Sequence, residues 1–414
     1  MKPFVASKVL MVEGIEDDPV TKARAERLLT GIEGPKPVTV DDAELARVIR
    51  EELSARGHHG MHADIEPVVI FNRYRLDDSE EEKTRRIEAY PELAGSKLGG
   101  YGGFDWRKSG GAAYRRETGA VCQPAWAIHS IVGCHFRCAY CNLGHYMNIM
   151  MNLEEFVGRL DGWLSWCPAQ KLFQYDNYTD AVCFEPEYGM AKLLIEYFAQ
   201  KPGKALEYYV GKSGYVDFLL DYDHRGHTVC CWSLSPSSQA ADFEYLSDST
   251  EERVEGMRKC QEAGYPVRVR LSPMVPVKGW REETRAMLEL LFDNVSPDIM
   301  TIETLRFLEY DQLAKSFDLS KLDDEFVAVM KEAAGKPVDF GCQIPDSYRI
   351  KMYDHIFAEL ERLSPDTPMA FCREQKRVWD RYADIFARHG QNTARYMCNC
   401  GPHCAPATAL AEPA

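Results

Sequence analysis

The chain has 414 residues, 45% of them hydrophobic and 27% charged, which is the composition of a globular protein with ample material for a core. No segment approaches about 18 consecutive apolar residues, and the N-terminal stretch lacks a signal-peptide core and cleavage site, so we expect a cytoplasmic protein without a membrane span. The formal net charge of -15 opposes nucleic-acid binding unless a local basic groove compensates, so nucleic acid is an unlikely partner on this ground.

Residues 1–116 are expected to form an N-terminal extension, with helical signals at Thr21–Thr30 and Asp41–Arg56. The glycine-rich stretch Leu98–Gly111 is expected to be a loop that links this extension to the core. It lacks the following Lys-Ser/Thr of a phosphate-binding loop, so it does not predict a nucleotide site.

Strand and helix signals alternate through residues 117–308, the predicted core. The expected strands are Ala125–Val132, Lys171–Tyr175, Leu206–Gly211, Thr228–Leu234, Val267–Ser272 and Asp298–Leu305. The expected helices are Asn152–Trp166, Pro186–Gln200, Thr250–Ala263 and Arg281–Phe292. Six strand–helix units at short spacing predict a parallel α/β fold, either an open sheet or a partial (β/α)6 barrel. In both, the active site lies at the carboxyl ends of the strands.

Residues 309–414 are expected to form a helical C-terminal region, with helices at Leu322–Ala334, Asp346–Leu363 and Glu374–Arg388. A short cysteine-bearing tail ends the chain. Of the 14 cysteines, two groups are tightly spaced, one near residue 138 and one in this tail. Dense cysteine clusters in a long chain indicate metal or cluster ligation more than a disulfide framework. The scattered cysteines are expected to be buried small hydrophobes.

The first group, GCHFRCAYCNLGHY at residues 133–146, follows the first predicted core strand and has the spacing C-x3-C-x2-C. Cys134, Cys138 and Cys141 on one short loop can bind three irons of a [4Fe–4S] cubane and leave the fourth iron open. An open iron can bind the amino and carboxylate groups of S-adenosylmethionine (SAM). The alternative is a zinc site completed by His135 or His145, but zinc sites more often use two C-x2-C pairs.

This spacing, with Tyr140 before the third cysteine, is the signature of the radical SAM superfamily. Further stretches over roughly residues 120–305 resemble its spore photoproduct lyase branch. In FQYDNYTDAV, Thr179 and Asp180 stand where that family has a serine and an aspartate that approach SAM. In YVGKSGYVD and WSLS, Lys212 and Ser233 stand where the family has a lysine and a serine that contact SAM. The resemblance therefore implies that these residues, with Tyr140, surround the cofactor.

One departure from the family bears on the substrate. The resemblance implies a cysteine just before the Thr/Ser–Asp pair that returns a hydrogen atom to the product radical, but Asn177 or Tyr178 stands there. Cys183 lies three residues after Asp180 and is either a replacement donor or a core cysteine, and we favour the core. The sequence thus favours a relative that kept the SAM chemistry and changed substrate.

The tail RYMCNCGPHCAP, residues 395–406, brings Cys398, Cys400 and Cys404 within seven positions. Three readings compete: an auxiliary iron–sulfur cluster completed by Cys372 or Cys342, a structural zinc, or a site for a thiophilic substrate on a mobile tail. The last is supported by a resemblance to radical SAM 3-amino-3-carboxypropyl transferases of arsinothricin biosynthesis, whose tail motif is not identical. A disordered terminus with incidental cysteines is the plain alternative.

A few charged residues are candidates for substrate contact. Glu303 and Arg306 follow the sixth strand, and either face the substrate or form a satisfied ion pair. Arg268 and Arg270 alternate along the fifth strand, so both point to one face, where they would bind a carboxylate or phosphate if that face is the barrel interior. His58, His59 and His62 more often belong to an exposed loop than to a metal site.

The sequence as a whole predicts a radical SAM enzyme that acts on a small molecule. One reaction it could catalyse is the transfer of a 3-amino-3-carboxypropyl group to a soft acceptor such as arsenite. Its cofactors would be a [4Fe–4S] cluster, SAM and a second metal or cluster at the tail, and its reductant a flavodoxin or ferredoxin. The alternatives are a 5'-deoxyadenosyl-radical enzyme of nucleic-acid lesion repair or modification, and a non-catalytic metal-binding protein.

Overall fold

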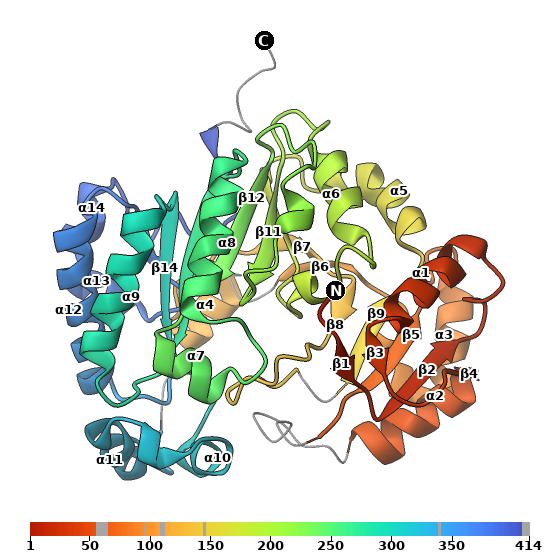
Figure 1. Cartoon of the computed structure of the whole chain (residues 1–414), viewed down its shortest axis with the longest axis horizontal. Coiled ribbons are helices and arrows are strands. Elements are labelled where there is room, and N and C mark those ends of the chain that lie inside the picture. The colour runs from red at the N-terminus through yellow and green to blue at the C-terminus, as the bar shows by residue number, and fades with distance from the viewer. Residues whose placement is uncertain (55–64, 95–96, 108–111, 144–145, 338–340, 408–414) are drawn as a thin grey trace.

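The computed structural model describes residues 1–54, 65–94, 97–107, 112–143, 146–337 and 341–407. Two main sheets organise them, and Figure 1 shows the smaller one, near the N-terminus, beside the larger core sheet. The core sheet has the strand order β15-β14-β13-β12-β11-β10-β7-β6, and all its pairs are parallel except β6 with β7.

The core strands alternate with helices along the chain, as the sequence predicts. The strands are β7 (Ala125–Ile128), β10 (Leu172–Tyr175), β11 (Ala205–Gly211), β12 (Thr228–Ser233), β13 (Val267–Met274) and β14 (Ile299–Thr304). The helices that follow them include α5 (Leu153–Leu164), α6 (Met190–Phe198), α7 (Ser237–Phe243), α8 (Thr250–Glu262) and α9 (Trp280–Asn294). Every residue of β11 and β12 is buried, as expected for parallel strands covered on both faces. The predicted α/β fold with a partial barrel is confirmed.

The N-terminal region differs from the prediction, because it contains a sheet as well as helices. The sheet has the order β4-β2-β5-β9-β8, formed by β2 (Lys8–Val12), β4 (Val38–Val40), β5 (Val68–Asn72), β8 (Ile131–Val132) and β9 (Tyr146–Met150). A small pair, β1 (Phe4–Val5) with β3 (Ile32–Glu33), lies alongside. The helices are α1 (Pro19–Leu29), α2 (Asp42–Val48) and α3 (Glu80–Ala89), and a π-helical turn, Ile49–Leu53, extends α2.

Two further predicted elements are corrected. The run Ala125–Val132 is divided between the two sheets, because Asp176 accepts from the Ser130 backbone N–H (3.0 Å) and contacts His129 Nδ1 (2.7 Å), turning the chain between β7 and β8. The glycine-rich stretch after Leu98 is not all loop, since Phe104–Arg107 is edge strand β6.

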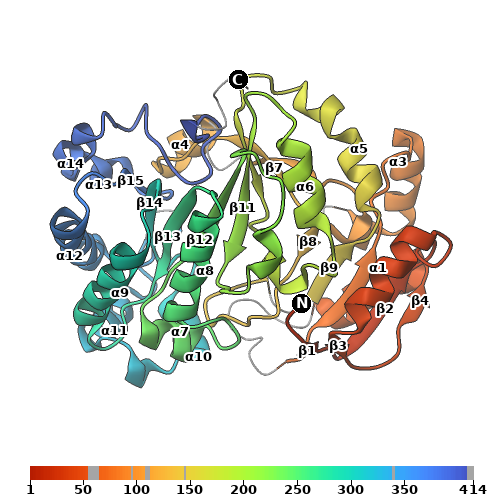
Figure 2. The same cartoon turned by 45° about the horizontal axis from the view of Figure 1, so that its top comes forward.

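The C-terminal region is mostly helical, with α10 (Tyr310–Ser316), α11 (Asp324–Ala333), α12 (Asp346–Leu363), α13 (Lys376–Arg381) and α14 (Ala383–Arg388). It also supplies β15 (Met369–Phe371), which pairs with β14 and so extends the core sheet. In the turned view of Figure 2, α12, α13 and α14 lie beside α9 at the edge far from the N-terminal sheet. None of the described helices has both the length and the apolar character needed to cross a bilayer.

Arg24 connects α1 to the core through buried hydrogen bonds and an ion pair. Its side chain is 3% exposed, Nε donates to the Tyr188 carbonyl (2.8 Å), and the guanidinium also binds the Met151 carbonyl and Glu154 (2.6 Å). We expect Arg24→Met to lower the free energy of unfolding by about 2–4 kcal/mol, because two buried carbonyls lose their donor.

Urea unfolding followed by circular dichroism measures this change. Arg27→Met on the same helix is the control, because Arg27 is exposed and makes one contact of this kind, to the Glu187 carbonyl. Equal midpoints for the two variants would contradict the assigned role of Arg24.

Candidate active site at the mouth of the barrel

The cysteine triplet lies on the loop between β8 and β9, at the carboxyl end of the core strands. Gly133 begins this loop at φ +106°, and a side chain there would collide with the Tyr146 carbonyl of β9, so glycine is required. Within the loop, the Cys141 N–H donates to the Cys138 carbonyl (2.9 Å). The Ala139 N–H donates to the carbonyl of Phe243, the last residue of α7 (2.8 Å), and so connects the loop to that helix. The loop therefore has a fixed place over the barrel.

The three thiols of the triplet lie close enough to interact electrostatically. Burial raises the pKa of Cys141 to about 11 and that of Cys138 well above its usual value, while the Lys212 ammonium lowers both. Among the described residues, no three His, Cys, Asp or Glu side chains already surround a point where one metal ion could sit. A cubane takes each thiolate at a separate iron, so three soft donors on one loop beside a cation still fit a [4Fe–4S] cluster.

Lys212, Asp180, Thr179 and Ser233 lie at or after the carboxyl ends of β10, β11 and β12, and the Lys212 charge acts on Cys138 and Cys141 of the triplet. Their contact with SAM stays a prediction. Lys212 is 7% exposed; its Nζ lies 5.6 Å from the centre of the Tyr140 ring, and its backbone N–H donates to Asp180 Oδ1 (2.9 Å). Thr179 Oγ1 is buried and has no hydrogen-bond partner in the part of the chain described. An ammonium and an open hydroxyl at one site can bind the carboxylate and polar groups of a bound molecule.

Ser233 ends β12, and its Oγ lies 2.6 Å from the Tyr209 hydroxyl of β11. Burial raises the pKa of Asp180 to about 6, although the Lys212 charge opposes the rise. Gly211 ends β11 at φ +78°, where a side chain would collide with the Asp180 carboxylate. The strand ends thus pack the polar groups tightly against one another.

Glu244, which follows α7, is the structural centre of this site, and sequence patterns did not single it out. Its fully buried carboxylate accepts from the Tyr140 hydroxyl (2.5 Å), Ser235 Oγ (2.8 Å) and Gln239 Nε2 (3.0 Å), and pairs with buried Arg253 (2.6 Å). Desolvation opposes its ionisation, but the charges of Arg253 and Lys212 outweigh this effect and hold its pKa at about 2. Glu244 therefore stays charged and fixes Tyr140 within the triplet loop.

A group of arginines lies at the carboxyl end of β14. Buried Glu303 pairs with Arg373 (3.1 Å), Arg306 (3.5 Å) and Arg270 (3.9 Å) and accepts from Ser272 Oγ (2.8 Å). The ion pair expected between Glu303 and Arg306 is confirmed, and their contact with substrate stays a prediction. Three guanidinium groups around one carboxylate leave a local excess of positive charge. Arg373, which sequence reasoning missed, completes this arginine group.

Arg268 does not take the ligand-binding role proposed for it. It is fully buried, pairs with Asp298 (3.0 Å) and donates to the Asn399 carbonyl (2.7 Å) and the Cys404 carbonyl. Arg268 thus holds the C-terminal tail, and of the two alternating arginines it is Arg270 that reaches the arginine group.

The tail with Cys398, Cys400 and Cys404 lies at the opposite end of the barrel from the triplet. Asn399 binds Glu207 near the start of β11 (3.0 Å) and Thr301 of β14 (3.0 Å). The Pro402 carbonyl accepts from Leu172 N–H at the start of β10 (3.1 Å). The described part of the tail is buried structure and not a disordered end, and its position does not favour an acceptor that reaches the triplet.

Other predicted residues are placed as follows. Cys183 is fully buried, and burial together with the nearby Cys134 thiol raises its pKa, so it lies next to the triplet. Tyr178 stacks on His129 with ring centroids 4.2 Å apart. His135 is buried against the ring of Phe4, 4.9 Å away. His145 and the three histidines at 58, 59 and 62 lie outside the described residues.

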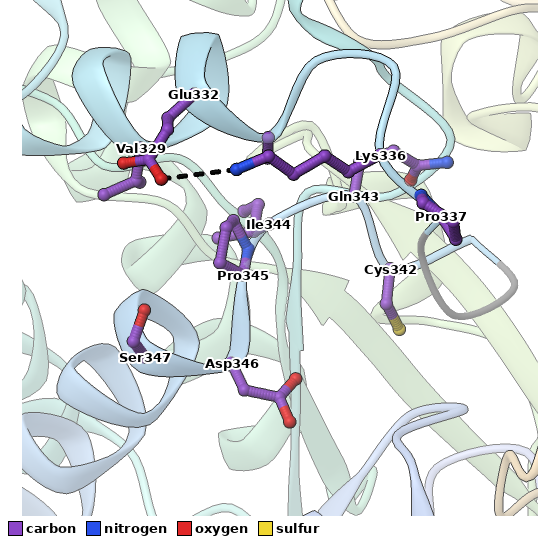
Figure 3. A pocket seen from close by; sticks show the side chains of 11 residues that line it. Val329, Glu332, Lys336, Pro337, Cys342, Gln343, Ile344, Pro345, Asp346 and Ser347 are labelled. Atoms are coloured by element: carbon purple, nitrogen blue, oxygen red, sulfur yellow. Dashed lines mark hydrogen bonds and ion pairs between the residues drawn. The ribbon is translucent and has the colours of Figure 1, made fainter.

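A cavity of about 540 Å³ lies away from the triplet, between α11 and the start of α12. Figure 3 shows its lining, in which Lys336 is linked to Glu332 (3.2 Å) and Cys342 stands on the inner side. The Cys342 thiol is buried, and its charge would act on Arg306, so one lining residue of the cavity lies near the arginine group.

Comparison with known proteins identifies the core. A family model, spore photoproduct lyase, matches residues 120–317. This segment, a little less than half of the chain, is therefore similar to the spore photoproduct lyase family. Spore photoproduct lyase of Bacillus subtilis (strain 168) is 27% identical over 192 residues, 45% of this chain and 56% of that protein. The enzyme of Clostridium acetobutylicum is 25% identical over 227 residues, 51% of this chain and 67% of that protein. The chain therefore matches little more than half the length of the first of these relatives.

Solved structures of spore photoproduct lyase share the fold. One, complexed with dinucleoside spore photoproduct, has a TM-score of 0.58 at 16% identity and covers 89% of this chain and 99% of that chain. A mutant with bound AdoMet and the same dinucleoside has a TM-score of 0.58 at 17% identity. The predicted resemblance to spore photoproduct lyase is confirmed, and nothing in these comparisons supports the resemblance to arsinothricin biosynthesis.

The expectation that nucleic acid is an unlikely partner is wrong, since solved structures of spore photoproduct lyase, which share this fold, include some with bound dinucleoside spore photoproduct. The expectation failed because it was based on the net charge of the whole chain. A total of -15 averages over the whole surface, whereas the arginine group at the mouth carries the opposite sign.

Removing the Glu244 charge tests its structural role. We expect Glu244→Gln to lower the free energy of unfolding at pH 7 by about 3–5 kcal/mol, because Arg253 is left as an unpaired buried charge. The folded pKa of Glu244 is depressed to about 2 from an ordinary 4.5, so its contribution is complete above about pH 4.5 and is lost as the pH falls toward 2.

Denaturant unfolding across pH 3–7 should therefore show a wild-type advantage that is constant above pH 4.5 and shrinks below it. Glu251→Gln, an exposed position on α8, serves as the control. An advantage that grows on acidification would refute the assigned charge state.

Proposed function

We propose that this protein is a radical SAM lyase of the spore photoproduct lyase type, acting through a 5'-deoxyadenosyl radical on a nucleic-acid lesion or modified nucleotide. The observation that carries the proposal is the family match over residues 120–317, which contains the triplet, Lys212 and Ser233. The reading as an aminocarboxypropyl transferase has no comparable support.

Cys134, Cys138 and Cys141 would hold the [4Fe–4S] cluster through thiolates. When bound, the cluster supplies the electron that cleaves a C–S bond of SAM. The chain itself provides the binding site: the Lys212 ammonium pairs with the SAM carboxylate, and the Thr179 and Ser233 hydroxyls bond its polar groups. Glu244 orients Tyr140 beside them.

The arginine group would anchor the substrate at the same mouth. Its excess positive charge suits the phosphate of a nucleic-acid strand, since guanidinium groups bind phosphate oxygens in a bidentate manner. Arg270 Nε is buried without a hydrogen-bond partner among the described residues, which leaves a donor for such a ligand. Glu303 holds the three arginines together against their mutual repulsion.

SAM cleavage provides the first test. In anaerobic turnover with dithionite, we expect the wild type to convert SAM to 5'-deoxyadenosine and methionine, and Cys138→Ala to form neither, because one iron loses its thiolate. Chromatography separates these products from methylthioadenosine. Cys167→Ala, a half-buried cysteine outside the triplet, should remain active. Methylthioadenosine as the product would support aminocarboxypropyl transfer instead, and no cleavage at all would refute both readings.

Binding of a DNA oligonucleotide that contains spore photoproduct provides the second test. We expect Arg373→Gln to weaken binding about 5–30-fold and to reduce the salt slope by about one, as loss of one phosphate contact does. Fluorescence anisotropy at several salt concentrations measures both. Arg381→Gln on α13 is a matched control, because Arg381 is half exposed and pairs with Asp354 far from the arginine group. Absence of salt-sensitive binding by the wild type would contradict a nucleic-acid substrate.

A further inference from the structure

Five cysteines from three separate segments come together inside the barrel. The three tail cysteines lie toward the amino ends of the strands, opposite the triplet, whereas Cys372 follows β15 and interacts with Cys122. None of them is exposed. We call them the sulfur group: Cys122, Cys372, Cys398, Cys400 and Cys404. The Tyr396 hydroxyl, buried behind them, interacts electrostatically with four of these thiols, which places them around one point in the fold.

The tail folds its own three thiols against each other. The Cys398 thiol lies close enough to those of Cys400 and Cys404 for them to raise its pKa, and the Cys398 backbone N–H donates to Cys404 Sγ (3.3 Å). A side chain at Gly401 would lie 2.5 Å from Cys404 Sγ and 3.0 Å from Cys398 Sγ, so the turn needs glycine to leave room for the sulfurs. Gln123 Nε2 also reaches Cys398 Sγ, at 3.6 Å.

The barrel holds this turn through hydrogen bonds from both side chains and backbone groups. Asn399 is 1% exposed and bridges Glu207 and Thr301, each at 3.0 Å. Lys171 N–H donates to the Pro402 carbonyl (2.6 Å), and Arg268 binds the Asn399 carbonyl (2.7 Å). A turn fixed by four separate strands or strand starts keeps its sulfur atoms in a defined place.

Three arginines surround the sulfur group. Arg107 interacts with Cys400, Cys122 and Cys398, while Arg270 interacts with Cys400 and Arg268 with Cys404. Arg107 Nε is buried without a hydrogen-bond partner in the described part of the chain. Neutral thiols need no compensating charge, whereas thiolates that bind a metal centre carry negative charge that buried guanidinium groups offset.

We propose that the sulfur group binds a second iron–sulfur cluster, through Cys398, Cys400 and Cys404 with a fourth thiolate from Cys122 or Cys372. Each thiol loses its proton as it binds an iron. A single zinc ion is the weaker alternative, because no described trio of side chains already surrounds one ion. The triplet shares this last property, as expected where each thiolate binds its own iron.

The decisive experiment measures metal in a variant that has lost the triplet. Cys134→Ala/Cys138→Ala/Cys141→Ala, purified anaerobically after iron and sulfide reconstitution, should keep about half the wild-type iron and sulfide and the broad visible absorbance of a cluster. Cys398→Ala/Cys400→Ala/Cys404→Ala should lose the other half. Absence of iron and sulfide from the triplet variant, or zinc in their place, would overturn the proposal.

Two further measurements keep the test independent of folding and of the proposed reaction. Within the triplet variant, Cys400→Ser should change or abolish the electron paramagnetic resonance signal of the reduced cluster, whereas Cys260→Ser, a buried cysteine of α8, should leave it unchanged. An identical signal in both would refute ligation by Cys400. Because the triplet variant cannot cleave SAM, its iron content reports on the sulfur group even if the proposed lyase activity is wrong.

Discussion

The buried ion pair of Glu244 with Arg253 is the constraint on which the mouth of the barrel depends. The pair costs desolvation, which is offset only because Glu244 also accepts from Tyr140, Ser235 and Gln239. Tyr140 belongs to the triplet loop, Ser235 follows β12, and Arg253 belongs to α8. One carboxylate thus joins the loop that would hold the cluster to the strand end and helix that form its surroundings.

The barrel has two chemically different ends, and Arg270 is common to both. Its guanidinium lies 5.3 Å from the centre of the Tyr209 ring and 3.9 Å from Glu303, at the mouth. It also interacts with Cys400 of the sulfur group. Ser233 and Tyr209 continue the contact toward Lys212 and the triplet. Linked polar side chains thus connect the two ends of the barrel.

Sequence patterns predicted the elements whose signal is local. The strands and helices of the core have strong periodicity, and Cys134, Cys138, Cys141, Lys212 and Ser233 stand at strand ends or on the loop after a strand. The division of Ala125–Val132 could not be predicted, because one apolar run serves two sheets and only buried Asp176, far along the chain, marks the break. The N-terminal sheet was missed although Val68–Asn72 is a short apolar run, since a short run alone does not separate a strand from a buried helix.

The sequence analysis missed three residues of the site for a different reason: Glu244, Arg253 and Arg373. Each lies in a segment without a recognisable motif. Each acquires its role only because the fold brings distant segments together. The same holds for charge. A net charge of -15 correctly describes the chain, yet Arg270, Arg306 and Arg373 converge on one carboxylate and reverse the sign where a substrate would enter. Electrostatic interactions fall off within about 8 Å at physiological salt, so a bound strand responds to these three arginines and not to acidic groups across the surface. The ligands that an acidic protein can bind therefore depend on the charged side chains that its fold brings together locally.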